Sequence, residues 1–246
     1  MKVSHEVPKN LLHVSRFFND YDYALDIHFD DAEYYNFFKT SVKLGRTVVL
    51  DNSLYERRIT GAEFNEENYI NYIKDINPTY YIVPDAYESG QANIDLFNKW
   101  MIEYGLELIS SKKIVVVHGS GYDDYVRCYQ HFDKSVKDND IIAFSGGDIW
   151  MDNRPSVLRR MYIDGIINTN RRHHLLGSVY PTEVKEYGKL NFIHSIDTSL
   201  PIISTLEGLR LDEITEKPKS VITKVFNDDI QWDLELLYHN LHTFKN

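Results

Sequence analysis

The sequence is poor in cysteine, in long apolar runs and in positive charge, and each shortage excludes a class of protein. Cys128 is the one cysteine among 246 residues, which excludes an internal disulfide and a cysteine-rich zinc cage. No apolar run approaches the roughly 20 residues of a membrane-spanning helix. The segment Met1–Glu6 also lacks the apolar core of a signal peptide. We therefore expect a soluble, intracellular, cytoplasmic protein with no membrane partner.

Positive charge is scarce, because 27 Lys and Arg face 37 Asp and Glu and the formal net charge is −10. This balance argues against a protein that coats nucleic acid without specificity, since phosphates are neutralised by Lys and Arg. A local basic patch is still compatible with the sequence. Its candidates, each of which is also compatible with an ordinary solvated face, are Arg57-Arg58, Arg154, Arg159-Arg160 and Arg171-Arg172.

Short apolar runs alternate along the chain with longer polar segments that are compatible with helices. The runs are Leu11–Val14, Ala24–Phe29, Thr47–Leu50, Tyr80–Val83, Ile114–Val117, Ile141–Phe144, His174–Leu176 and Phe192–Ile196. The expected helices are Asp31–Lys43, Asn65–Ile76, Asn93–Ile109, Tyr122–Lys137 and Pro155–Ile167. Continuous apolar runs are typical of parallel strands that are buried on both faces. Their alternation with helices predicts an α/β protein with a parallel sheet.

Eight runs fit a (β/α)8 barrel, which we expect to occupy residues 1–246 as a single domain. The connector between the first two runs is too short for a full helix, so one of them is alternatively an outlying hairpin. A doubly wound open sheet is the other architecture, but no Gly-x-Gly-x-x-Gly motif and no P-loop follow any run. Val221–Phe226 is a candidate edge strand, and Asp228–Phe244 is expected to form a closing amphipathic helix.

Polar residues follow many of these runs at the point where each run ends. They are Asp51–Glu56, Asp85–Tyr87, His118–Gly121, Ser145–Asp148, Gly177-Ser178 and Asp197–Ser199. Taken singly, each group has an ordinary explanation as a helix cap, a tight turn or a satisfied core histidine. In a barrel, however, the carboxyl ends of all strands meet on one rim and build the active site. Their convergence there favours a catalytic site.

The residue types on this rim suit chemistry at a glycosidic carbon. Asp51, Asp85 and Asp197 supply three carboxylates, and no metal-ligand cluster accompanies them. One carboxylate attacks the anomeric carbon while another moves a proton, so we expect neither metal nor cofactor. A glycine pair, Gly146-Gly147, lets the backbone approach a planar ligand closely, and Tyr55 offers a stacking face.

In this order, the motifs resemble those of the tRNA-guanine transglycosylase superfamily, in particular its short viral-type members that insert 7-deazaguanines into DNA. The resemblance extends from about Leu50 to Pro201. It implies a glycosyltransferase, more narrowly a pentosyltransferase, that exchanges guanine for a preQ0-like 7-deazaguanine in DNA or tRNA. It also implies a covalent intermediate between sugar and protein, and a protein of the host cytoplasm that a virus encodes.

Two motifs carry the catalytic roles in this resemblance. Asp197 matches the nucleophilic aspartate that attacks C1′ of a guanosine nucleotide. Asp51-Asn52-Ser53-Leu54-Tyr55 looks like the family's Asp-Ser-Gly-Gly-Phe/Tyr, which implies proton transfer by Asp51 and base stacking by Tyr55. From the residue types alone, Thr198 and Ser199 are candidates for holding the Asp197 carboxylate in place.

The other matching motifs are those that bind the base. Asp85 matches the aspartate that reads the base, and His118-Gly119 stands where the family has Gln-Gly. Gly146-Gly147 resembles the family's Gly-Gly turn. His174-Leu175-Leu176-Gly177 resembles Tyr-Leu-Met-Gly, with Leu176 in place of the methionine that packs on the base.

The sequence departs from the family where a polymer would bind. The structural zinc site is missing because Cys128 is alone, and Thr198–Pro201 replaces the arginines that normally follow the nucleophile. We expect Arg57, Arg58 and Arg154 to contact phosphates, and DNA to be slightly preferred over tRNA. A homodimer or a partner protein remains open. The alternatives are a nucleoside or glycoside hydrolase that uses the same carboxylates, and a non-catalytic base-binding subunit.

Overall fold

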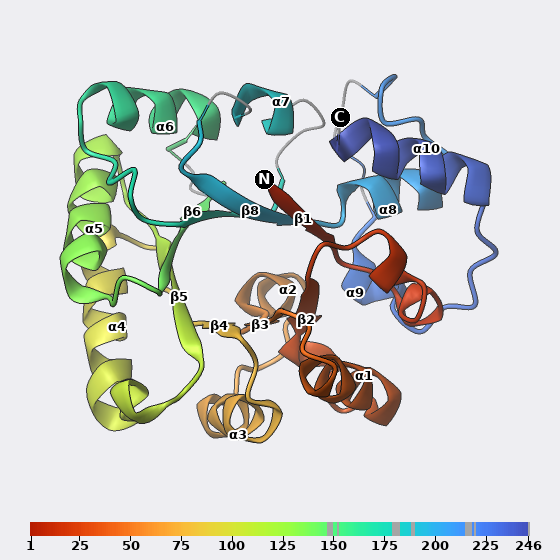
Figure 1. The fold of residues 1–246 in the computed structure, drawn as a ribbon, viewed down its shortest axis with the longest axis horizontal. Helices are drawn as coiled ribbons and strands as arrows, with labels where there is room; N and C mark the ends of the chain where they lie inside the picture. The colour runs from red at the N-terminus through yellow and green to blue at the C-terminus, as the bar shows by residue number, and fades with distance from the viewer. Residues whose placement is uncertain are drawn as a thin grey trace.

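Eight parallel strands among the described residues form a nearly closed barrel that is surrounded by helices (Figure 1). The computed structural model describes residues 1–146, 150–151, 153–178, 183–187, 190–214, 218 and 220–245. The strands are β1 (Lys2–His5), β2 (Asp22–Leu25), β3 (Val48–Asp51), β4 (Tyr80–Ile82), β5 (Lys112–Val117), β6 (Ile141–Ser145), β7 (His173–Leu176) and β8 (Ile193–Thr198). Their order around the sheet is β1-β8-β7-β6-β5-β4-β3-β2. The predicted (β/α)8 barrel is therefore confirmed.

The seam between β1 and β2 is closed by individual hydrogen bonds to the last residues of β1. The buried side chain of Asn19 accepts a hydrogen bond from the N–H of His5 at 2.7 Å and donates one to its carbonyl at 2.9 Å. The Ser4 hydroxyl donates to the carbonyl of Tyr21 at 2.7 Å, and the N–H of Asp20 donates to the carbonyl of Val3 at 2.9 Å. These bonds satisfy backbone groups that would otherwise lie at two open sheet edges.

Helices follow most of the strands, and a polar side chain caps the start of several of them. They are α1 (Ala32–Lys43), α2 (Leu54–Thr60), α3 (Glu66–Ile76), α4 (Gly90–Glu103), α5 (Tyr122–Ser135), α6 (Arg154–Ile163), α7 (Glu183–Tyr187), α8 (Leu200–Leu206), α9 (Ile222–Val225) and α10 (Leu234–Lys245). Short 3-10 turns occupy Lys9–Leu11, Ser15–Phe17, Asp26–His28 and Leu106–Leu108. Asp31, Asn65 and Ser89 accept hydrogen bonds from the first N–H groups of α1, α3 and α4. None of the helices in the described ranges has the length and apolarity to cross a membrane.

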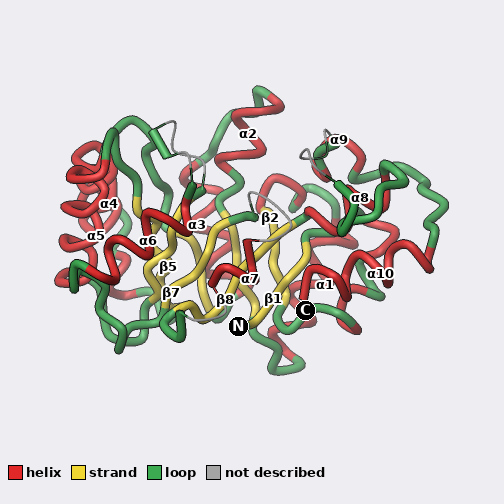
Figure 2. Tube along the Cα trace, turned by 90° about the horizontal axis from the view of Figure 1, so that it is seen from above, coloured by secondary structure: helices red, strands yellow, loops and turns green. Residues whose placement is uncertain are grey.

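The apolar core has two layers, because successive side chains of a strand point to opposite faces. Inside the barrel lie Tyr23, Val49, Ile82, Val116 and Ala143, packed against one another. The outward-facing residues of the same strands pack against the helices in a larger layer. Figure 2 shows α2 and α9 above the carboxyl ends of the strands, with the N-terminus at the opposite end. The upper end of the barrel is thus the place for a ligand site.

The first strand lies elsewhere than the apolar pattern predicts. Leu11–Val14 is no strand but part of a helical turn, in which Leu11 and Leu12 are buried. The strand that completes the barrel is instead β1. Val3 is its one aliphatic residue, so β1 has no apolar run in the sequence. The expected strand Ala24–Phe29 already ends at Leu25 and continues as a 3-10 turn.

Several element boundaries also differ from the prediction. Helix α4 begins at Gly90 and ends at Glu103, because Ser89 caps it, whereas the prediction was Asn93–Ile109. The expected edge strand Val221–Phe226 is instead the short helix α9, and Ile222 within it and Phe226 directly after it are both buried. The closing helix begins at Leu234 rather than Asp228, since the side chain of Asp233 accepts from the N–H of Leu236 at 3.0 Å.

The hydrogen bonds between Asn19 and His5 predict that Asn19 contributes to the stability of the protein. An Asn19→Ala substitution removes both side-chain hydrogen bonds to His5 and leaves buried backbone groups without partners. We expect it to lower the free energy of unfolding by about 1–3 kcal/mol in urea denaturation. The control is Asn68→Ala on the exposed face of α3, which should change it by less than about 0.5 kcal/mol. Equal stability of the two variants would contradict the structural role of Asn19.

Candidate active site

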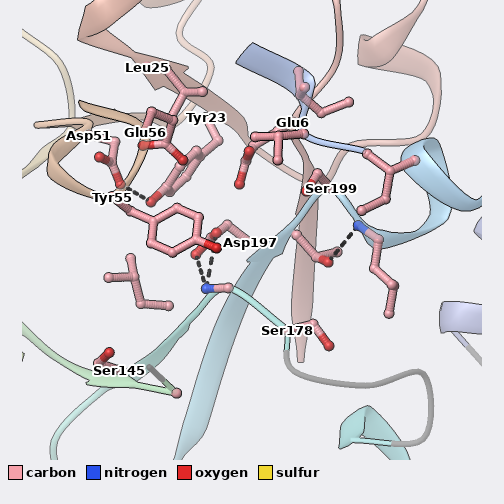
Figure 3. Close-up of a pocket in the computed structure, with 18 of the residues that line it drawn as sticks. Glu6, Tyr23, Leu25, Asp51, Tyr55, Glu56, Ser145, Ser178, Asp197 and Ser199 are labelled. Atoms are coloured by element: carbon pink, nitrogen blue, oxygen red, sulfur yellow. Dashed lines mark hydrogen bonds between the residues drawn. The ribbon is translucent and has the colours of Figure 1, made fainter. Parts of the chain in front are cut away.

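A cavity of about 380 Å³ opens at the carboxyl ends of the strands, a volume that suits a small organic ligand. Five carboxyl side chains line it, those of Glu6, Asp51, Glu56 and Asp197, which Figure 3 labels, and that of Asp85. Within the part of the chain that the structure describes, no Lys, Arg or His lines this cavity. The site is therefore strongly acidic unless some of these groups hold protons.

Strand alternation aims the two principal aspartates at the cavity. Val49 points into the barrel, so Asp51, two residues later at the end of β3, lies on the same face and at the rim. Asp197 lies near the end of β8, and its partner in the parallel ladder is Ser4 of β1. The three aspartates predicted from the sequence thus reach one cavity, and Asp85 does so from the loop after β4.

Asp197 is held by groups from the neighbouring strand β7. The N–H of Gly177 donates to both carboxylate oxygens at 3.1 Å, and Nε2 of His174 lies 2.8 Å from Oδ1. The other ring nitrogen of His174 lies 2.9 Å from the hydroxyl of Ser195. Gly177 has a φ of +64°, a conformation that glycine adopts without strain. The buried carboxylate is therefore fixed in orientation while it still lines the cavity.

Asp51 is anchored on the other side of the cavity. The hydroxyl of Tyr23 donates to its Oδ2, and the N–H of Ser53 donates to its Oδ1 at 2.5 Å. Burial and the neighbouring Glu56 raise the pKa of Asp51 well above its ordinary range, against the opposing effect of these two hydrogen bonds. The Tyr23 ring also stacks on His174 with 6.3 Å between centroids, so it connects the two aspartate sites.

Asp85 is positioned by its two neighbours. Nε2 of His118 lies 2.6 Å from Oδ2, and the side-chain amide of Asn52 donates to Oδ1 at 3.2 Å. His118 itself is fully buried and does not line the cavity. Its predicted contact with the base is therefore wrong, because Asp85 lies between the imidazole and the ligand space. His118 instead fixes the carboxylate that faces the ligand.

Most of the other residues predicted to bind the base line the cavity, as expected from the sequence. Tyr55, Gly146, Leu176 and Gly177 line the cavity, and half of the Tyr55 side chain is exposed at its mouth. Gly147 lies outside the described residues. Among the described residues, Thr198 forms no hydrogen bond with Asp197, and its hydroxyl instead accepts from the N–H of Leu200 at 3.0 Å at the start of α8.

Two carboxyl groups of the cavity, Glu6 and Glu56, were missed in the sequence. Glu6 follows β1, a strand without an apolar signal, and Glu56 lies in the first turn of α2 beside Tyr55. Burial raises the pKa of Glu56 to about 7, with a further contribution from the charge of Asp197. Burial, Glu56 and Asp197 raise the pKa of Glu6 well above its ordinary range. Burial and mutual repulsion therefore shift Glu6, Asp51 and Glu56 toward their protonated forms.

The three arginines predicted to contact phosphates have different environments. The side chain of Arg154 is fully buried, with its Nε 2.7 Å from Glu183 and its other nitrogens bonded to the carbonyls of Phe144, Leu176 and Gly177. The prediction that Arg154 binds phosphate is therefore wrong, because the guanidinium has no path to a ligand.

Arg57 and Arg58 lie on α2 at the upper end of the barrel, above the strand ends. Arg57 is bound to Asp26 at 2.9 Å and to the carbonyl of Glu63 at 2.6 Å, so its charge is already compensated. Arg58 is exposed, and its guanidinium lies 5.8 Å from the ring centre of Tyr87, which lines the cavity. Arg58 is thus the better placed of the two for a phosphate.

No model of a known protein family matches the chain, and no curated protein matches it either. The functional argument therefore depends on the cavity and its chemistry.

The environment of Arg154 predicts a large loss of stability on its removal. Arg154→Ala leaves the buried carboxylate of Glu183 without its cation and removes the side-chain donors of three carbonyls. We expect the free energy of unfolding to fall by about 3–5 kcal/mol in urea denaturation. Arg159→Ala, at an exposed position of the same helix, is the control and should have little effect. An Arg154→Ala protein of normal stability would show that this network contributes nothing.

The raised pKa of Glu56 predicts a pH-dependent effect on stability. A carboxyl group whose pKa is 4.5 in the unfolded chain and about 7 in the fold retains its proton in the fold, so stability falls as pH rises between these values. Glu56→Gln removes this titration. The variant should exceed the wild type by roughly 2–3 kcal/mol at pH 8, with the difference vanishing near pH 4. Exposed Glu235→Gln on α10 is the control, and a pH-independent difference for Glu56→Gln would contradict the assignment.

Proposed function

We propose that this protein is a glycosyltransferase that exchanges guanine for a 7-deazaguanine in a nucleic acid. The observation that carries the proposal is the arrangement of Asp197. Its carboxylate is oriented by Gly177 and His174 at the cavity wall, and carboxyl groups of raised pKa share the same cavity. A carboxylate placed to attack, opposite carboxyl groups that can carry a proton, is the combination that glycosyl transfer through a covalent intermediate requires.

The reaction consists of two displacements at C1′ of the sugar. In the first, an Asp197 oxygen forms a bond to C1′ while the bond from C1′ to N9 breaks, and guanine leaves with the electron pair and takes up a proton. In the second, a 7-deazaguanine loses its N9 proton and displaces Asp197. A carboxyl group of the cavity carries the proton, a role that the family resemblance gives to Asp51. Holding both partners in line is worth up to ~7–11 kcal/mol in well-oriented cases.

The cavity offers complementary groups for a planar purine-like base. Tyr55 and Leu176 provide apolar faces, and the backbone at Gly146 and Gly177 allows close approach. Asp85 presents a carboxylate that His118 and Asn52 hold in place, and this suits the adjacent N–H donors of guanine and 7-deazaguanine. A preQ0-like base shares that edge, so the same contacts serve the departing and the incoming base.

Polymer binding in this proposal depends on the rim of the cavity rather than on its interior. Phosphates are repelled by ionised carboxylates, so the backbone must pass outside the cavity, where Arg58 is exposed. DNA is slightly preferred over tRNA, because the chain lacks the zinc site that accompanies the family's larger members.

A second candidate is a nucleoside or glycoside hydrolase that uses the same carboxylates with water as acceptor. The specific observation in its favour is the acidic lining, which contains no cation among the described residues. A small neutral nucleoside enters such a cavity more readily than a polyanion does. The two candidates differ in one requirement, since only the exchange reaction needs an incoming base.

An exchange assay tests the proposal and distinguishes the transglycosylase from the hydrolase. DNA and tRNA that carry labelled guanine are incubated with the protein, with and without a preQ0-like base. We expect labelled guanine to be released only when that base is present, and Asp197→Ala to reduce the rate by on the order of 10³-fold or more. Exposed Asp212→Ala is the control and should retain the wild-type rate. Full exchange by Asp197→Ala would contradict the nucleophile, and release without an incoming base would indicate hydrolysis.

A further inference from the structure

We propose that Glu6, rather than Asp51, protonates the leaving guanine, and that the charge on Asp197 determines when Glu6 releases its proton. The inference rests on the proposed function and names a further catalytic residue for it. Its physical basis is the position of the two carboxyl groups, which come from the paired strands β1 and β8 into one cavity and lie close enough for a side-chain hydrogen bond between them. Two carboxyl groups share such a bond only when one of them holds a proton.

The backbone of β1 aims Glu6 at Asp197. Ser4 is the ladder partner of Asp197, and Glu6, two residues further, points to the same face of the sheet. The N–H of Glu6 donates to the carbonyl of Thr198 at 3.1 Å, which extends the pairing with β8 by one residue. Figure 3 shows the Glu6 side chain pointing into the cavity that Asp197 lines.

The groups that face Glu6 come from several elements, and the carboxyl groups among them favour its neutral form. They are the carboxyl groups of Asp51, Glu56 and Asp197 and the phenols of Tyr21, Tyr23, Tyr34 and Tyr55. Burial makes the largest contribution to the raised pKa of Glu6, followed by Glu56 and then Asp197. The contribution from Asp197 is the one that the reaction itself removes.

Nucleophilic attack therefore turns Glu6 into a stronger acid. When an Asp197 oxygen bonds to C1′, the carboxylate becomes an ester and loses its negative charge. At the same time N9 of guanine receives the electron pair of the broken bond and needs a proton, which Glu6 supplies. In the second half, the Glu6 carboxylate accepts the N9 proton of the incoming base, and the pair of the C1′–O bond returns to Asp197. One base has replaced another, and no proton is gained or lost.

The other carboxyl groups are less suited to this role. Both oxygens of Asp51 accept hydrogen bonds, one from the hydroxyl of Tyr23 and one from the N–H of Ser53. Glu56 responds to the charge of Asp197 but forms no hydrogen bond with it in the described structure. Glu6 alone of the three combines a proton with direct contact to the nucleophile.

Leaving-group chemistry tests the proton transfer. DNA that contains 7-methylguanine expels a base that is already neutral and needs no proton, whereas guanine needs one. Glu6→Gln retains a hydrogen-bond donor but has no acidic proton. We expect it to slow adduct formation on guanine by ~10²–10⁴-fold and to leave the rate on 7-methylguanine nearly unchanged. Glu56→Gln should slow adduct formation on guanine and on 7-methylguanine by the same factor. Glu235→Gln, at an exposed position, should change neither rate.

A second measurement needs no substrate. The carboxyl resonances of glutamates labelled with ¹³C report the titration of Glu6, which is assigned by its loss in Glu6→Gln. Asp197→Asn removes the negative charge beside Glu6, so we expect the pKa of Glu6 to fall by roughly 1–3 units. An unchanged titration of Glu6 in Asp197→Asn overturns the pairing of Glu6 with Asp197. The proton transfer is overturned if Glu6→Gln slows adduct formation equally on guanine and 7-methylguanine, or does not slow it on guanine. A wild-type protein that expels neither base overturns the proposed function instead, and the titration then decides the pairing by itself.

Discussion

The hydrogen bonds that hold the buried carboxylate of Asp197 are the constraint on which the rest of the site depends. A buried charge is expensive unless donors surround it, and here Gly177 and His174 supply them from the adjacent strand. Once Asp197 is stabilised as an anion, further anions in the same cavity become unfavourable. The raised pKa values of Glu6 and Glu56 follow in part from this one charge. The charge of Asp197 thus adds to the effect of burial, which is the largest cause of the raised pKa values of its neighbours.

The position of Gly177 depends in turn on Arg154. This arginine donates to the carbonyls at the ends of β6 and β7, including that of Gly177, while Glu183 neutralises it. A turn with left-handed backbone has few local bonds of its own, so a buried guanidinium with several donors is an effective clamp. Arg154 therefore acts on the nucleophile through the backbone, although it touches neither the cavity nor the ligand.

The sequence predicts the fold because most strands are continuous apolar runs, and each of the six strands predicted between Thr47 and Ile196 is present, whereas the candidate edge strand Val221–Phe226 is a helix. It also carries Asp51, Asp85 and Asp197, since they stand at strand ends and all strand ends of a barrel meet. Glu6 could not be predicted from the sequence because β1 has no apolar run. Without that run, the residue after β1 could not be recognised as a position on the rim of the barrel. The role of Arg154 was equally hidden, because its burial depends on carbonyls and a carboxylate that are distant in the sequence.

The acidic cavity and the net charge of −10 bear on how a nucleic acid would approach. If every cavity carboxyl were ionised, a phosphate backbone near the rim would meet a field that rejects it. Burial raises the pKa values of Glu6, Asp51 and Glu56, which shifts these groups toward their neutral forms and weakens that field. The protonation that prepares the acids for catalysis then also lowers the barrier to a polyanion. We infer that substrate binding and chemistry weaken together as pH rises through the range in which these groups ionise.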